Sequence, residues 1–164
     1  MKPLLVRDLM TVGVPTCKRD TPVRQVARLL VEKDLEAVCV LDEEGNGIGV
    51  VGLEEIIAAY GREGLEDLPA EAIMREGMPT LKPDMPLTLA AQFMRDQRTR
   101  IAYMTHNAAG IIYPAAYITY RHFLRYLAAV SPEELRDLGI AASRKSPLEA
   151  FAERRERKRK ELLG

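Results

Sequence analysis

The spacing of apolar residues changes in a regular way along the first 60 residues. A short extended segment over 15–18 leads to Asp20-Thr21-Pro22, and the residues that follow have helical spacing: Val23, Val26, Ala27 and Leu30. Two β-rich runs, 37–41 and 48–51, then flank a polar turn over 42–47, and a helix over 54–60 ends near a glycine. The predicted order is strand, helix, strand, strand, helix. We expect Asp20 or Thr21 to cap the first helix and Pro22 to lie in its first turn.

The same pattern recurs 64 residues later. Residues 10–22 (MTVGVPTCKRDTP) and 74–86 (MREGMPTLKPDMP) are identical at seven of thirteen aligned positions. Residues 50–52 align with 117–119 at an offset of 67, so the second repeat has three extra residues. The uncharged stretch 101–120 is interpreted as two strands and a turn, with Pro114 at an edge or bulge, rather than as a membrane span. Because a unit of roughly 60 residues is marginal alone, the two repeats are expected to share a core.

Composition and charge exclude several classes of protein. The chain has 164 residues, 47% of them hydrophobic, with 24 basic and 24 acidic side chains, which is typical of a soluble globular protein and not of a disordered one. The zero net charge is a cancellation, because residues 144–164 hold 8 basic and 4 acidic side chains. The N-terminus does not resemble a signal peptide, and Cys17 and Cys39 fit buried, reduced thiols, so a cytoplasmic location is expected. Two Cys and two His, scattered, predict no metal site.

Candidate catalytic motifs have simpler interpretations. Residues 47–52 read G-x-G-x-x-G, but the glycines alternate with apolar residues of a predicted strand, where glycine marks a close approach of backbone. Neither cysteine has a histidine placed beside it as a base, and no Ser-His-Asp or paired-carboxylate spacing is present. We therefore predict that the protein is not an enzyme and has no catalytic residues.

The ordered set of motifs resembles the tandem CBS-domain pair, also called a Bateman module, over roughly residues 4–128. The similarity rests on four stretches that follow one another along the first repeat: VRDLMT at 6–11, DTPV at 20–23, VCVLDEEG at 38–45 and GVVGLEEI at 49–56. It implies a mixed α+β fold of two βαββα repeats packed as a pseudo-twofold pair, followed by a C-terminal helical tail. The predicted divisions are 1–64, 65–130 and 131–164.

The resemblance also implies a function. Such pairs bind adenosine-containing ligands (AMP, ADP, ATP or S-adenosylmethionine) in clefts between the repeats and commonly act as regulatory homodimers, with no required cofactor. In the family, a Thr or Ser ends the last strand, and an Asp three residues later accepts hydrogen bonds from the ribose. Here the two positions are Gly52 and Glu55 in the first repeat, and Thr119 and His122 in the second. At this point the second repeat is therefore expected to bind phosphate, or another group, rather than ribose.

The candidate ligand-binding residues that follow from the resemblance are Thr16, Lys18, Ala37, Glu55, Thr80, Lys82, Arg100, Ala102, Thr119, Arg121 and His122. Some of them have structural alternatives that the sequence leaves open. Thr16 and Thr80 fit a turn or cap hydroxyl as well as a cleft-lining position. His122 also fits a partly exposed helix residue.

The basic C-terminal tail supports a second function. Its candidate polyanion contacts are Arg154, Arg155, Arg157, Lys158, Arg159 and Lys160. A solvated or dimer-capping helix is the favoured interpretation of this segment, and contact with nucleic acid or an acidic partner is the alternative. The alternative function for the whole chain is accordingly a ligand-free dimerisation scaffold that presents this tail. No interaction with a membrane is predicted.

Overall fold

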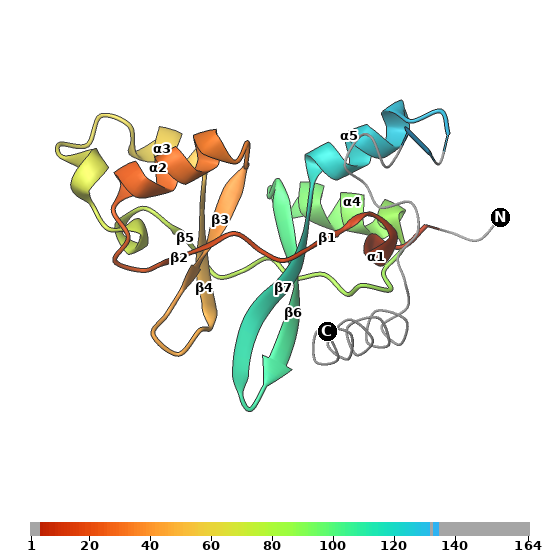
Figure 1. The fold of residues 1–164 in the computed structure, drawn as a ribbon, viewed down its shortest axis with the longest axis horizontal. Coiled ribbons are helices and arrows are strands. Elements are labelled where there is room, and N and C mark those ends of the chain that lie inside the picture. The colour runs from red at the N-terminus through yellow and green to blue at the C-terminus, as the bar shows by residue number, and fades with distance from the viewer. Residues whose placement is uncertain (1–3, 132, 135–164) are drawn as a thin grey trace, which may run out of the picture.

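The structure, a computed structural model, describes residues 4–131 and 133–134 as two similar units side by side (Figure 1). The first unit contains β2 (Thr16–Lys18), α2 (Val23–Glu32), β3 (Ala37–Leu41), β4 (Gly47–Gly52) and α3 (Leu53–Ala59). The second contains α4 (Leu87–Asp96), β6 (Ile101–Ala108), β7 (Ile111–Thr119) and α5 (Tyr120–Ala128). Short elements complete the chain: α1 (Val6–Leu9), β1 (Thr11–Val12), η1 (Leu65–Asp67), η2 (Ala70–Ala72) and β5 (Arg75–Glu76). The predicted order of elements is confirmed in the first repeat.

The two sheets exchange their edge strands. One sheet has the order β2-β3-β4-β5 and the other β1-β7-β6, so β1 joins the second repeat and β5 joins the first. Thr80 forms an isolated parallel bridge to Tyr103, which is the counterpart of the parallel pairing of Thr16 with Cys39 at the predicted offset of 64. The segment before each repeat therefore crosses to the opposite repeat and ties the pair together.

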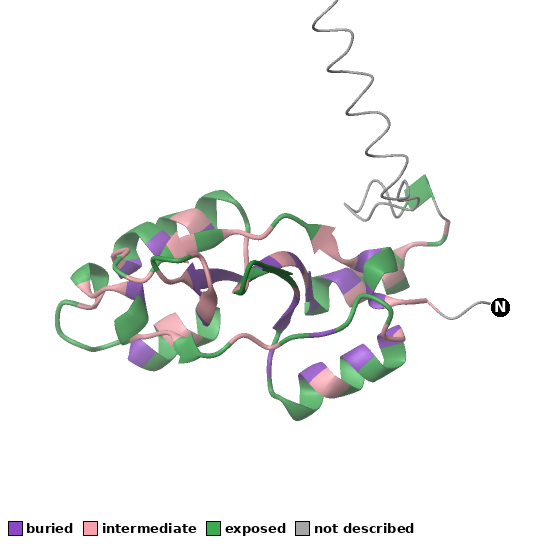
Figure 2. Cartoon of the chain, turned by 90° about the horizontal axis from the view of Figure 1, so that it is seen from below, coloured by how far each residue is buried: buried purple, intermediate pink, exposed green. Residues whose placement is uncertain are grey.

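Three apolar cores hold the described part of the molecule. One lies in the first repeat around Val38 and Val51, and one lies in the second repeat, where Val6 of α1 packs with Ile118. The third lies between the repeats and includes Cys39 and Tyr103, which occupy equivalent positions of the two repeats. Figure 2 shows that buried residues gather in the strands, while each long helix keeps an exposed side. The prediction that the repeats share a core is confirmed.

The helix starts differ from the sequence prediction in one detail. Pro22 and Pro86 are the N-caps of α2 and α4, in extended conformation, rather than residues of the first turn. The Thr21 hydroxyl accepts a hydrogen bond from the Lys18 backbone N–H at 3.1 Å and does not cap the helix. A side chain of this length can satisfy the local turn instead of the helix end, which the sequence does not distinguish.

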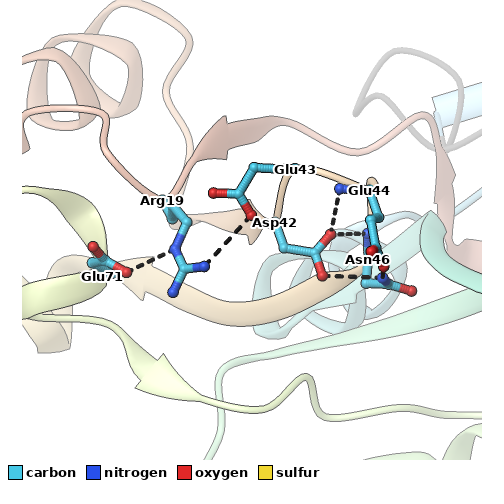
Figure 3. A network of polar contacts seen from close by, with 6 residues as sticks. All are labelled: Arg19, Asp42, Glu43, Glu44, Asn46 and Glu71. Carbon is cyan, nitrogen blue, oxygen red and sulfur yellow. Dashed lines mark hydrogen bonds and ion pairs between the residues drawn. The ribbon is translucent and has the colours of Figure 1, made fainter.

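A polar network fixes the turn between β3 and β4 (Figure 3). The Asp42 carboxylate accepts hydrogen bonds from the Asn46 backbone N–H (2.8 Å) and side-chain amide (3.0 Å), and these bonds lower the Asp42 pKa. The Asn46 side-chain oxygen, Oδ1, in turn accepts from the backbone N–H of Ile112 at 2.9 Å. Nearby, the Arg19 side chain contacts Glu71 at 2.8 Å. The bond between Asn46 and Ile112 attaches the turn to the β6–β7 hairpin of the other repeat.

The glycines and Pro114 lie where the sequence places them. Residues 47–52 form β4, so the G-x-G-x-x-G motif belongs to a strand. A side chain on Gly49 would lie 2.5 Å from the sulfur of Met74, and one on Gly52 would lie 2.6 Å from the Glu36 carbonyl oxygen. The register of β6 and β7 shifts beside Pro114, which confirms a bulge there. These glycines allow close packing of backbone and do not form a phosphate-binding loop.

Candidate functional site

A cleft opens between the repeats where β4 ends and α3 begins. Repeat 1 contributes one wall, which is made by Glu36, Ala37, Val50 and 52–55. Repeat 2 contributes the other wall, which is made by Arg75, Pro79 and 99–101. We call this site the Glu55 cleft. Its cavity volume is about 30 Å³, enough for roughly two water molecules, so a larger ligand requires its walls to move apart.

Glu55 holds the N-terminus of α3 and faces this cleft. One carboxylate oxygen, Oε2, accepts a hydrogen bond from the Gly52 backbone N–H at 2.9 Å. A carboxylate at this point satisfies an unpaired N–H of the first helical turn and interacts favourably with the helix dipole. Because a carboxylate has two acceptor oxygens, Oε1 is left to accept from a ligand.

An ion pair crosses the Glu55 cleft. Arg100 of repeat 2 approaches the Glu54 carboxylate of α3 at 3.0 Å, and about half of each side chain is exposed. Arg75, on the same wall as Arg100, donates to the carbonyl oxygens of Gln97 and Arg98 at 2.9 and 3.2 Å. Arg75 is therefore committed to the end of α4, whereas the ion pair of Arg100 among the described residues is the solvent-exposed one with Glu54.

The equivalent place on the other side of the pair is closed by His122. His122 is 3% exposed, and its Nδ1 accepts from the backbone N–H of Thr119 at 3.0 Å. Since Nδ1 is an acceptor, the neutral ring carries its proton on Nε2, which lies 2.8 Å from the Thr11 hydroxyl oxygen. The Thr119 hydroxyl is also 3.0 Å from Nδ1, and Tyr117 packs edge-on against the ring. The lone pair of Nδ1, which is the acceptor of the neutral ring, is already used by the Thr119 N–H and is not available to a ribose.

A second ion pair crosses on the His122 side with its charges reversed. Arg121 contacts Asp34 at 2.6 Å and Glu36 at 3.7 Å. By the internal repeat, Arg121 is the equivalent of Glu54, and Glu36 is the equivalent of Arg100. Each side of the repeat pair is thus bridged by an arginine and a carboxylate at the same two positions.

Burial perturbs the ionisation of Glu36. Desolvation raises the pKa of this carboxyl above its ordinary value, and the nearby Arg121 offsets part of that increase. Within the described part of the chain, its Oε2 atom is buried without a hydrogen-bond partner. The charged form of Glu36 is therefore poorly accommodated at the edge of the Glu55 cleft.

Comparison with known proteins identifies a family for the first repeat. The family model described as CBS domain matches residues 6–62. The uncharacterized protein MJ1426 of Methanocaldococcus jannaschii is 39% identical over 54 residues, which cover 33% of this chain and 32% of that protein. Residues 6–62, the first repeat, are a CBS domain. The aligned part of the chain spans about a third of the length of this curated relative.

Solved structures show that the chain folds as a CBS-domain pair. The CBS domain pair of protein MJ0100, solved in complex with 5′-methylthioadenosine and S-adenosyl-L-methionine, has a TM-score of 0.67 and 17% identity. The alignment covers 77% of this chain and 97% of that one. CBSX2, solved in complex with AMP, has a TM-score of 0.61 and 21% identity over 75% of this chain and 95% of its own. Identities this low establish the fold alone.

The candidate residues of the CBS pair separate into three groups in the structure. Ala37, Glu55 and Arg100 come together in the Glu55 cleft. On the opposite side, Thr119 and His122 are hydrogen-bonded to each other, and Arg121 pairs with Asp34 and Glu36. The third group is absent from the lining of the Glu55 cleft and comprises Thr16, Lys18, Thr80, Lys82 and Ala102.

Members of the third group have other surroundings. Thr16, Lys18, Thr80 and Lys82 are exposed, and the Thr80 hydroxyl donates to the Met78 carbonyl oxygen at 2.9 Å, which is the turn alternative. Ala102 is fully buried in the core of the second repeat, since successive residues of β6 point to opposite sides of the sheet. The tail residues 154–160 lie outside the described residues.

The sequence reasoning missed cleft residues that have a detectable signal. Glu36 and Glu54 line the Glu55 cleft, and each is the repeat equivalent of an arginine that had been selected. Comparing charges at equivalent positions would have identified both carboxylates. Arg75 carries no such signal, because its role depends on the exchange of β5 between the two sheets.

The thiols are not suited to nucleophilic chemistry. Burial raises the pKa of Cys17 to about 11 and that of Cys39 to about 12. Cys39 is fully buried, as predicted, whereas Cys17 is only partly buried. Among the described residues, no group of three or more His, Cys, Asp or Glu side chains is arranged to hold a metal ion. None of the described helices has the length and apolarity needed to cross a membrane.

Proposed function

We propose that the protein is a regulatory module that binds an adenosine-containing ligand, AMP, ADP, ATP or S-adenosylmethionine, in the Glu55 cleft. The observation that carries this proposal is the cleft itself, where Glu55 lies on one repeat and Arg100 on the other. The two similar folds solved with adenosine ligands support it. No cofactor is required, and the protein acts by binding rather than by catalysis, in the cytoplasm.

The chemistry of the cleft provides for both ends of a nucleotide. Glu55 accepts from a ribose hydroxyl through Oε1 while Oε2 continues to cap α3. Arg100 exchanges Glu54 for a phosphate or carboxylate of the ligand. An exposed ion pair contributes only about 0–1 kcal/mol, so opening the cleft in this way costs little.

The two sides of the pair have different roles in this proposal. A ligand on the His122 side would have to displace the bonds from His122 to Thr119 and Thr11. Breaking bonds to buried groups costs about 1–3 kcal/mol for each group left unsatisfied. We therefore expect one adenosine ligand per chain, in the Glu55 cleft.

Transmission of the binding signal requires a second protein surface, and we propose that this surface joins two copies of the chain. The helix that follows the last strand of each repeat has exposed apolar residues at equivalent positions. They are Leu53, Ile57 and Tyr60 in and just after α3, and Tyr120, Leu124 and Leu127 in α5. Contiguous exposed apolar surface of this kind marks interaction sites. A ligand that binds one relative pose of the repeats more tightly than another would then shift the pose of the dimer.

Isothermal titration calorimetry on protein freed of bound nucleotide tests the ligand. AMP, ADP, ATP and S-adenosylmethionine are titrated into the wild-type chain, Glu55→Gln and a control, Glu63→Gln, at an exposed position outside the cleft lining. Glutamine keeps an acceptor for the Gly52 N–H but removes the charge and one acceptor oxygen. We expect at least one ligand to bind wild type and Glu63→Gln, with at least tenfold weaker binding to Glu55→Gln. Absence of heat with all four ligands would refute the proposal.

The narrowness of the Glu55 cleft favours a second candidate function, a ligand-free dimerisation scaffold. In this role the basic residues 154–160 contact an acidic partner or nucleic acid. Binding through phosphate contacts weakens steeply as salt rises. Gel-shift assays with RNA and DNA at several salt concentrations, comparing the full chain with a chain lacking 144–164, test this role. Equal shifts for the two proteins would eliminate the nucleic-acid version.

A further inference from the structure

Two buried side-chain polar atoms in the described part of the chain have no hydrogen-bond partner, and both lie at or directly behind the Glu55 cleft. They are Oε2 of Glu36 and the hydroxyl oxygen of Tyr103. Glu36 lines the cleft, and Tyr103 is 0% exposed. Buried polar groups in folded proteins are nearly always paired, and a buried tyrosine usually finds a partner for its hydroxyl. Two exceptions at one place therefore require an explanation.

Tyr103 lies directly behind the wall that repeat 2 contributes to the cleft. Ile101 of β6 lines the cleft, and Tyr103, two residues further along the strand, points to the same side of the sheet. Both belong to the apolar core between the repeats, together with Ala37 and Val50, which line the cleft from repeat 1. The Tyr103 backbone N–H donates at 2.7 Å to the carbonyl oxygen of Pro79, another lining residue. Tyr103 is therefore the next side chain inward along β6.

The hydroxyl of Tyr103 is a hydrogen-bond donor. Burial raises the pKa of Tyr103 well above its ordinary value, and the charge of Glu55 adds to the increase. The phenol therefore stays protonated at neutral pH. Because Glu55 contributes to the shift, the hydroxyl lies within electrostatic range of the carboxylate that faces the cleft.

Glu36 supplies the complementary acceptor. Its Oε1 atom lies 3.7 Å from Nε of Arg121, which leaves Oε2 as the buried acceptor without a donor. The cleft thus has one unused donor on Tyr103 and one unused acceptor on Glu36, beside the apolar side chains of Ala37 and Ile101. An apolar surface with a few placed polar groups is suited to a flat heteroaromatic ring.

We propose that Tyr103 and Glu36 recognise the adenine base: when the cleft opens, the Tyr103 hydroxyl donates to a ring nitrogen of the base and the Glu36 carboxylate accepts from its 6-amino group. This assignment rests on the adenosine ligand of the proposed function. Adenine carries a donor amino group beside acceptor ring nitrogens, so it matches the two unused atoms. Hypoxanthine carries an acceptor oxygen in place of the amino group, and that oxygen would face the carboxylate with no proton between them. Leaving buried polar groups unpaired is costly, so the pair selects adenine.

Calorimetry with variants and a base analogue tests the assignment. Tyr103→Phe removes one hydroxyl and keeps the ring, and Tyr113→Phe makes the same change on the exposed hairpin, outside the cleft lining. Each is titrated with whichever of AMP, ADP, ATP and S-adenosylmethionine binds the wild-type chain, and with the counterpart of that ligand that carries hypoxanthine. Glu36→Gln completes the set, because its amide N–H can donate to the hypoxanthine oxygen. Thermal melting of the ligand-free proteins measures the contribution of each side chain to the fold.

We expect Tyr103→Phe to bind the adenine ligand at least fivefold more weakly than wild type or Tyr113→Phe does. Its melting temperature should not fall, because the hydroxyl has no partner in the ligand-free protein. Wild type should prefer adenine over hypoxanthine at least tenfold, and Glu36→Gln should reduce that preference.

Four results would overturn the assignment and leave the proposed function standing. They are unchanged binding by Tyr103→Phe, a lowered melting temperature of that variant, equal affinity of wild type for the two bases, and an unchanged preference in Glu36→Gln. Absence of binding of all four adenosine ligands to the wild-type chain would overturn both the assignment and the proposed function.

Discussion

Replacing His122 by alanine tests whether the hydrogen bonds of this side chain stabilise the fold on the His122 side of the repeat pair. The variant removes the acceptor of the buried Thr119 N–H and the partner of the Thr11 hydroxyl. Loss of a helix cap costs about 1 kcal/mol, and an unsatisfied buried polar group costs about 1–3 kcal/mol. We therefore expect His122→Ala to lower the free energy of unfolding by about 2–4 kcal/mol.

Urea unfolding followed by far-UV circular dichroism measures this loss. The matched control is His106→Ala, because His106 lies on the exposed hairpin, where its ring contacts Tyr113 edge-on at 5.4 Å. Surface substitutions of this kind change stability by about 0.5 kcal/mol or less. If His122→Ala destabilises the protein no more than His106→Ala does, the bonds to Thr119 and Thr11 do not hold this side closed and our reasoning is wrong.

Three further changes test other parts of the structure. Gly52→Ala should lower the free energy of unfolding in urea by about 1–3 kcal/mol, because its Cβ would lie 2.6 Å from the Glu36 carbonyl oxygen. Gly47→Ala is the control and should cost less, because its Cβ would meet the flexible side chain of a methionine. Equal losses in the two variants would contradict the close approach at Gly52. Glu36→Gln should raise the melting temperature at pH 7 but not at pH 3. The pKa of Glu36 is raised, so its charged carboxylate reduces stability above the folded pKa, whereas the neutral form at pH 3 does not. A melting-temperature difference between variant and wild type that is the same at both pH values would contradict this. Cys17 and Cys39 should react slowly with a thiol reagent at pH 8 in the folded protein and rapidly in urea, and fast reaction of the folded protein would contradict their raised pKa values.

The parts of the fold that depend on local pattern were predictable from the sequence. The repeat at an offset of 64, the strand at 47–52 and the bulge beside Pro114 follow from periodicity and from the properties of glycine and proline. The exchange of β1 and β5 between the sheets was not predictable, since two-residue strands carry no periodicity and pair with residues far along the chain. That exchange brings Arg75 to the cleft.

The candidate site was predictable as a set of positions but not as a set of interactions. The resemblance directed attention to Glu55 and His122, which are both at the third residue of a helix that follows a last strand. The structure shows that both cap their helices and that His122 also contacts Thr11 of the exchanged strand β1. A sequence pattern identifies a residue that faces a cleft, but the distant partner that uses its lone pair depends on tertiary packing.

Counting the bound ligands tests the central claim most directly. Native mass spectrometry of the wild-type protein, with whichever of the four adenosine ligands gives calorimetric heat, reports the number of ligands on each intact assembly. Our account predicts one ligand per chain and two per dimer, with the signal lost in Glu55→Gln. Two ligands per chain, or binding unchanged by Glu55→Gln, would contradict the assignment of the Glu55 cleft as the single regulatory site of the chain.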